Sequence, residues 1–228
     1  MGTSASFRAP VVPRWQAFTT ALQMGLPLER VQSELFNAGP EWEEALGAPA
    51  IAAFAVVLLD AHQTLPDRLR AAERPELALQ QLVSEARAAS DAEAGSAAGA
   101  MAERAFLGLL TRVTAGDASL SQATPEGAAE RFAAARGAPG EFVTGYVGEL
   151  LGQYARHVTA REAGRLTEGE AGITVSATRR LTRTLAAAAE EVGREASAPS
   201  DRDAIRSGWE PLIREAFARG RRLPEADA

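Results

Sequence analysis

Two side chains that often form covalent intermediates, cysteine and lysine, are absent from this sequence. The 228 residues include no cysteine, and all 24 basic residues are arginines, so thiolate nucleophiles, Schiff-base lysines and a Walker A lysine are excluded. The primary amine that remains is the α-amino group, whose usual pKa is about 7.7–8.0. The chain opens MGTSAS, and Gly2 is small enough for Met1 to be removed. Removal of Met1 would therefore free a glycine amine at the start of the chain, which is one interpretation of this opening; an unstructured tail is the other.

The two histidines are weaker candidates. Asp60 and His62 stand two residues apart, so on one helix they point to different faces, and we expect His62 at the surface or at a helix end. His157 is expected in the last turn of a helix, where a positive group suits the helix dipole. A pairing of His157 with Glu162 is the weakest hypothesis, that of an enzyme. With no Gly-x-Ser-x-Gly elbow and no zinc ligand set, the sequence favours a protein that is not an enzyme and has no intrinsic cofactor.

Three glycines, Gly145, Gly148 and Gly152, lie within one helical pattern. Each costs roughly 1 kcal/mol relative to alanine in a helix interior, so their presence needs a reason. We expect another helix to approach closely at this face, either within the fold or across a subunit contact. Glu149 in the middle of the segment argues against a membrane dimer motif.

Arg179, Arg180 and Arg183 form a small basic face. The usual role of such a face is to be solvated on one side of a helix. Contact with phosphate groups is the alternative. It is disfavoured because the protein as a whole is acidic and no aromatic residues are interleaved with the arginines.

The elements that must position these residues are helical. Apolar residues recur at spacings of three and four, and the clearest pattern, Phe142 to Tyr154, predicts one apolar face on a long helix. Thr124 followed by Pro125 is typical of an N-cap and a first-turn proline. Ser200 resembles the start of a capping box for a last helix.

The predicted fold is all-α: a multi-helix bundle in one domain or two packed lobes, with an extended N-terminal tail. The expected boundaries are a tail at 1–14, an N-terminal helical lobe at 15–85, a candidate linker at 86–99 and a C-terminal helical lobe at 100–228. The alanine-rich linker could equally be a helix with an alanine face. The segment GITVS, 172–176, is the plausible strand, and it is too short to build a sheet.

The charge and composition of the chain limit the classes of partner that we expect. The net charge of −6 favours solubility and gives no general attraction to phosphate backbones or anionic membranes, so direct binding to nucleic acid is not expected. The longest apolar run, 48–59, is shorter than the roughly 20 residues that span a bilayer. With no signal-peptide pattern at the N-terminus, we expect a cytoplasmic protein.

The small residues of MGTSAS could thread a narrow active site, and Pro10 and Pro13 would stiffen the chain behind them. Four segments, MGTSASFRAP, PVVPRW, GLPLERVQSELFNAG and FVTGYVGELLGQYARHVTAREAGRL, together resemble the QatB component of bacterial Qat anti-phage defence systems. The Met-Gly-Thr-Ser-x-Ser start is the most specific part of the resemblance. The resemblance covers less than half of the chain.

The resemblance implies three partners: a QueC-like enzyme, a P-loop ATPase and a TatD-like nuclease. It implies that the QueC-like enzyme attaches a deazaguanine to the N-terminal glycine once Met1 is removed. Carried over by position, Gly2 is the acceptor, and the partner would recognise Thr3, Ser4, Ser6, Phe7 and Arg8. The family often has histidine where this chain has Phe7.

The alternative hypothesis is a helical scaffold or adaptor with an inert tail. Such a protein would bind its partners through the glycine-lined helix face that holds Gly145, Gly148 and Gly152.

Overall fold

The computed structural model describes residues 13–90, 96–116, 119–168 and 174–222, and within these ranges it contains helices and no strand, so the all-α prediction is confirmed. The helices in chain order are α1 (Pro13–Gln23), α2 (Leu28–Ala38), α3 (Pro40–Gly47), α4 (Pro49–Ala71), α5 (Pro75–Ala89), α6 (Ala97–Ala115), the 3-10 turn η1 (Leu120–Gln122), α7 (Pro125–Ala135), α8 (Pro139–Glu168), α9 (Val175–Arg194) and α10 (Arg202–Arg221).

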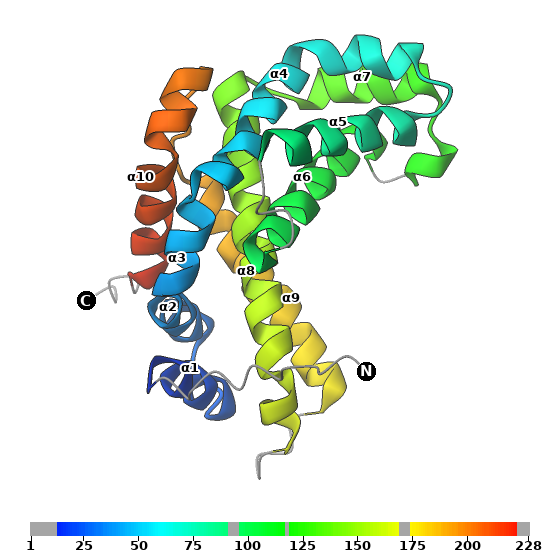
Figure 1. Ribbon diagram of the computed structural model, residues 1–228. Coiled ribbons are helices and arrows are strands. Elements are labelled where there is room, and N and C mark those ends of the chain that lie inside the picture. The colour runs from blue at the N-terminus through cyan, green and yellow to red at the C-terminus, as the bar shows by residue number, and fades with distance from the viewer. Residues whose placement is uncertain (1–12, 91–95, 117–118, 169–173, 223–228) are drawn as a thin grey trace, which may run out of the picture.

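Helix α8 runs through the middle of the molecule, with α10 on one side of it and the α4–α7 group on the other (Figure 1). It packs most extensively on α9 and also contacts α1, α4 and α6. Residues 146–152 are all buried, which is more than a full helical turn. The residues predicted for its apolar face are buried, but a single apolar face was the wrong description, because neighbours cover this part of the helix on every side.

Helix α4 is the second core element and packs on α5, α6, α7, α8 and α10. Among the described residues it is the one helix long and apolar enough to cross a membrane. Half of its apolar stretch is buried inside the bundle. Core helices of soluble proteins have the same character, so α4 is weak evidence for a membrane span.

Helix α4 contains Pro66 in its interior. A proline has no N–H to give to the carbonyl four residues earlier, which here is that of His62. The guanidinium of Arg136, at the end of α7, donates to that carbonyl instead. The kink-prone site in α4 is therefore tied to the turn that leads into α8.

The helix starts follow local chemistry. Thr124 caps α7 by accepting a hydrogen bond from the Gly127 N–H, as predicted. The last helix differs: Asp201, not Ser200, is its N-cap, and its carboxylate accepts from the Ala204 N–H at 2.8 Å. The capping-box prediction was wrong by one residue, because Asp in the cap position satisfies the same N–H groups.

Helix α10 returns the chain to its beginning. The rings of Phe217 and Phe36 meet edge to face at 5.2 Å. The indole of Trp209 donates to the Leu46 carbonyl at the end of α3, at 2.8 Å. A methyl group at Gly220 would overlap the Phe36 ring, so α10 lies directly on α2 at this point.

The predicted lobes at 15–85 and 100–228 share one continuous core, since α4 and α2 from the first pack on α8 and α10 from the second. Of the candidate linker at 86–99, residues 86–89 end α5 and 97–99 begin α6; 91–95 lie outside the described residues. Most of the predicted tail also lies outside them. Of the strand-like segment at 172–176, residues 172–173 lie outside the described residues, while Thr174 caps α9 and Val175 and Ser176 begin it, so the described part is the start of a helix and not a strand.

Candidate functional site

The glycine-lined face of α8 is occupied by α9. A methyl group built on Gly193 of α9 would lie 2.6 Å from the Cα of Gly148, and one built on Gly148 would lie 2.8 Å from the Glu190 carbonyl oxygen. These two glycines therefore let the helix backbones meet. Of the two arrangements expected from the sequence, a contact within the fold accounts for Gly148 and Gly152. Gly145 faces Leu109 of α6 at ordinary contact distance.

Gly152 makes room for a carboxylate. A methyl group at this position would lie 2.5 Å from Cγ of Glu190, whose side chain lies across the helix at that point. Glu190 is bound by two arginines, Arg156 at 2.5 Å and Arg194 at 3.1 Å. The glycine spacing thus provides for a polar contact as well as for a close helix approach.

One turn away, Glu149 is buried on α8 and pairs with Arg112 of α6. Burial lowers the pKa of the Arg112 guanidinium, and the nearby positive charge of Arg194 lowers it further. Because Glu149 and Glu190 are each held by arginine, they lock α6, α8 and α9 together. The pair of Glu190 with Arg194, four residues apart on α9, could have been found from its spacing. The pairs of Glu149 with Arg112 and of Glu190 with Arg156 could not, since each joins two helices and the partners are more than thirty residues apart.

His62 lies in the middle of α4 and is buried, so the prediction of a surface or helix-end position was wrong. Its Nε2 is 3.0 Å from the Gly137 carbonyl oxygen, and since a carbonyl only accepts, this nitrogen carries the proton. Gly137 has a φ of +61°, which favours glycine and turns the chain between α7 and α8. Together with Arg136, His62 fastens that turn to α4.

His157 lies well inside α8, not in its last turn as expected, because the helix continues to residue 168. Its ring packs edge to face on Trp42 at 5.2 Å. Desolvation lowers the pKa of His157, and the charges of Arg161 and Arg104 lower it further. Glu162 is buried and bound by Arg161 at 3.2 Å. Five residues of helix turn His157 and Glu162 to different sides, so the structure does not bring this predicted pair together.

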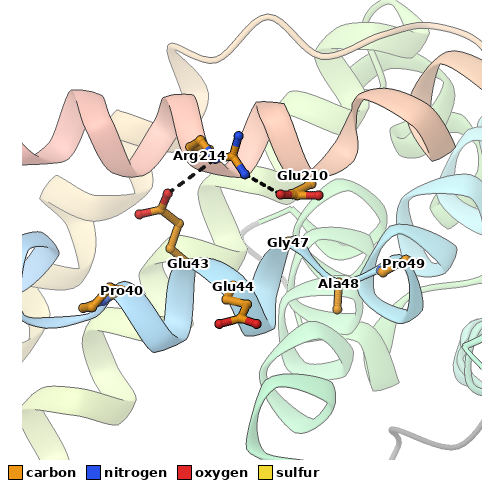
Figure 2. Close-up of a pocket in the computed structure, with 8 residues that line it drawn as sticks. All are labelled: Pro40, Glu43, Glu44, Gly47, Ala48, Pro49, Glu210 and Arg214. Atoms are coloured by element: carbon orange, nitrogen blue, oxygen red, sulfur yellow. Dashed lines mark hydrogen bonds and ion pairs between the residues drawn. The ribbon is translucent and has the colours of Figure 1, made fainter.

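A surface hollow of about 560 Å³ lies between α3, the start of α4 and α10. Figure 2 shows Arg214 reaching from α10 between Glu43 of α3 and Glu210 of its own helix. Glu43 is bound a second time, by Arg221. The carboxylates that Arg214 contacts are thus neutralised across the helix contact. In the part of the chain that the structure describes, no group of His, Asp or Glu side chains could hold a metal ion.

Arg179, Arg180 and Arg183 are exposed on α9, as predicted for a basic face. No ion pair joins any of them to another of the described residues. This sets them apart from Arg156 of α8 and Arg214 of α10, which are bound to carboxylates.

The predicted modification site and recognition residues, Gly2, Thr3, Ser4, Ser6, Phe7 and Arg8, lie outside the described residues. What the structure describes is the point where the tail joins the body. Trp15 is buried at the start of α1, and the guanidinium of Arg161 lies over its ring at 4.8 Å. Phe18 is fully buried one turn later.

Comparison with models of protein families, with curated proteins and with solved structures found no match to this chain.

Proposed function

We propose that this protein is a non-enzymatic component of a bacterial anti-phage complex of the Qat kind, in which a QueC-like partner conjugates a deazaguanine to Gly2 after Met1 is removed. The observation that carries the proposal is the start of the chain, MGTSAS, on a protein without lysine. With no lysine present, the α-amino group is the primary amine that an acylating enzyme can reach. The proposed setting is the bacterial cytoplasm.

The anchoring of α1 in the core supports the proposal that the N-terminal segment is attached to a packed body. Trp15 and Phe18 hold the first helix in the core, and Arg161 of α8 covers the Trp15 ring. The residues before them therefore start from a defined point on a packed body. Twelve residues precede α1, and fully extended they span at most about 40 Å, so the N-terminus cannot lie farther than this from the start of α1.

The buried ionisable groups of the body also fit a carrier better than an enzyme. Glu149 and Glu190 are bound by arginines, and His62 is hydrogen-bonded to a backbone carbonyl. A general acid or base needs a free partner position in reach of a substrate. These groups instead connect helices, so the proposal assigns catalysis to the QueC-like partner and leaves ATP hydrolysis and nucleic-acid cleavage to the P-loop ATPase and the TatD-like nuclease.

Intact-mass measurement tests the proposal. The protein is purified after co-expression with its neighbouring genes, with and without a QueC-like gene. We expect a mass equal to the chain without Met1 plus one deazaguanine adduct, and only in the presence of the QueC-like enzyme. Gly2→Pro should abolish the adduct, because it replaces the primary amine by a secondary one, while Gly145→Ala in the body should retain it. An unmodified Met-less chain in the complete set would refute the proposal.

The same mass measurement can test whether the partner recognises the side chains at positions 7 and 8. If the partner reads the side chain at position 7, Phe7→His should raise the fraction of modified protein, whereas Arg8→Ala should lower it. Equal adduct fractions in all three proteins would remove Phe7 and Arg8 from the recognition site and leave Gly2 as the acceptor.

A scaffold or adaptor with an inert tail is the second candidate. The observation in its favour is the set of unpaired arginines on α9, which no contact within the described fold explains. The glycine face cannot serve as its docking site, because α9 covers Gly148 and Gly152. Deletion of residues 2–9 separates the two candidates: loss of defence with the fold retained supports the modified tail, and unchanged defence supports the adaptor.

A further inference from the structure

An apolar groove of about 480 Å³ lies on the surface where α2 meets α9. We call it the α2–α9 groove, and its lining includes Leu26, Leu28, Val31, Ala177, Arg180 and Leu181. The groove is formed because the turn after α1 brings Leu26 to the start of α2, while α9 presents Ala177 and Leu181, four residues apart, on the same side.

One exposed apolar side chain lies close to the lining in the sequence. Met24 is 69% exposed and lies two residues before Leu26, in the turn between α1 and α2. Val175 is also exposed, but on α9 it faces away from Ala177, two residues on, so it is not counted with the groove. An apolar groove beside an exposed methionine fits an interaction surface.

The charge beside the groove identifies what would bind there. Arg180 brings a positive charge to the lining. Arg183, three residues after Arg180, and Arg179, four residues before Arg183, lie on the adjoining exposed side of α9. The three guanidinium groups have no ion-pair partner among the described residues, in a protein whose net charge is −6. An acidic protein that keeps three unpaired arginines together offers carboxylates a local site.

We infer that the α2–α9 groove docks an acidic amphipathic helix of a partner protein. Apolar side chains of that helix would fill the space between α2 and α9, and its carboxylates would pair with Arg180, Arg183 and Arg179. An apolar centre with arginine at its rim is the usual composition of a helix-in-groove interface. The inference does not depend on modification of Gly2, since it rests on residues of α2, of α9 and of the turn before α2.

The chain's own ends are less suitable occupants. The segment 1–12 contains Arg8 and no carboxylate, so its charge opposes that of α9. The segment 223–228, LPEADA, is acidic, but it follows Arg221, which binds the side of α2 that carries Ser33 and Phe36. At 100° per residue that side lies away from Leu28 and Val31, so the segment would have to cross α2 to reach the groove.

A labelled peptide tests the inference on the full-length protein. The probe is two copies of the heptad Glu-Leu-Leu-Glu-Ala-Leu-Glu, and its control is the same peptide with lysine in place of glutamate. Fluorescence anisotropy should show saturable binding of the acidic peptide, weakened by added salt, and about tenfold weaker or no binding of the lysine peptide. Arg180→Glu with Arg183→Glu should weaken binding of the acidic peptide about tenfold and strengthen that of the lysine peptide.

Two variants control the experiment. Arg206→Glu on α10 changes the same charge at an exposed site away from the groove and should leave binding unchanged. Leu181→Asp places a carboxylate in the groove and should abolish binding, with a circular dichroism spectrum that matches the wild type. Equal binding of the acidic peptide to the wild type and to the Arg180→Glu, Arg183→Glu protein would overturn the inference.

The other occupants give distinct results. Binding of a single-stranded oligonucleotide that depends on Arg180 and Arg183, without binding of the acidic peptide, would mean a phosphate site and refute the proposed partner. Peptide binding that arises only after deletion of 223–228 would identify the chain's own end as the occupant. A dimer in sedimentation velocity that Arg180→Glu dissociates would identify a second copy. Each of these three results overturns the inference, while the Gly2 adduct is measured separately.

Discussion

The contact between Gly148 and Gly193 makes a sharp test of the packing argument. In Gly193→Ala, the new methyl group would lie 2.6 Å and 2.7 Å from Cα and N of Gly148 and 2.8 Å from the Val147 carbonyl carbon. Ordinary carbon contacts are about 3.5–4.0 Å. The atoms in the way belong to the backbone of α8, which is buried on all sides at this point, so no side chain can turn aside to relieve the overlap.

The expected loss of stability follows from two opposing effects. Overpacking of a core costs about 1–3 kcal/mol, and an overlap with backbone belongs at the upper end of that range. Alanine in place of glycine in a helix returns roughly 1 kcal/mol. We therefore expect Gly193→Ala to lower the free energy of unfolding by about 2 kcal/mol, which is about a 30-fold increase in the unfolding equilibrium constant.

Urea denaturation followed by circular dichroism measures this change. Gly145→Ala is the matched control, since its methyl group would meet only the end of the Leu109 side chain, at 3.4 Å. That variant should keep the stability of the wild type or gain up to about 1 kcal/mol. If Gly193→Ala and Gly145→Ala have the same urea midpoint, close packing of α8 on α9 is not the reason for the glycines at positions 148 and 193.

Three further measurements address other parts of the structure. Tyr146 is fully buried, its hydroxyl has no hydrogen-bond partner among the described residues, and burial raises its pKa. In urea denaturation, Tyr146→Phe should have the free energy of unfolding of the wild type or exceed it by up to about 1 kcal/mol, and a clear loss of stability would show that the hydroxyl does have a partner. The pKa of His157 is lowered in the folded state, so below about pH 6.5 the unfolded chain binds the proton more readily and the protein becomes less stable as the pH is lowered. His157→Gln should therefore reduce the decline of Tm between pH 7.5 and pH 5. An unchanged slope would contradict the lowered pKa. Asp201→Ala should cost about 1 kcal/mol and Ser200→Ala almost nothing, and the reverse order would restore Ser200 as the cap.

Local signals allowed the helices to be predicted from the sequence. Thr124 with Pro125 marks a start because cap and first-turn chemistry act over a few residues. Pro66 shows where local signals mislead. It indicates a break in α4, but Arg136, seventy residues later, supplies the hydrogen bond that the proline cannot make, so the helix continues. No pattern around residue 66 contains that information.

The polar residues were harder to predict than the apolar ones. The glycine spacing at Gly148 and Gly152 correctly indicated a close helix approach, because glycine in a helix has a cost that needs a reason. The burial of His62 and the pairing of Glu149 with Arg112 depend on which helices meet, and that is decided by the whole fold. The α2–α9 groove is of the same kind, since its two walls come from opposite ends of the chain.

The return of α10 onto α2 has a consequence for how this protein is made. The packing of Phe36 is incomplete until Phe217 and Gly220 of α10 are in place, and the Leu46 carbonyl oxygen accepts its hydrogen bond from Trp209 of the same helix. A nascent chain leaving the ribosome therefore exposes apolar surface of α2 and α3 until α10 has been synthesised. Truncated products that lack α10 should depend on chaperones or be degraded.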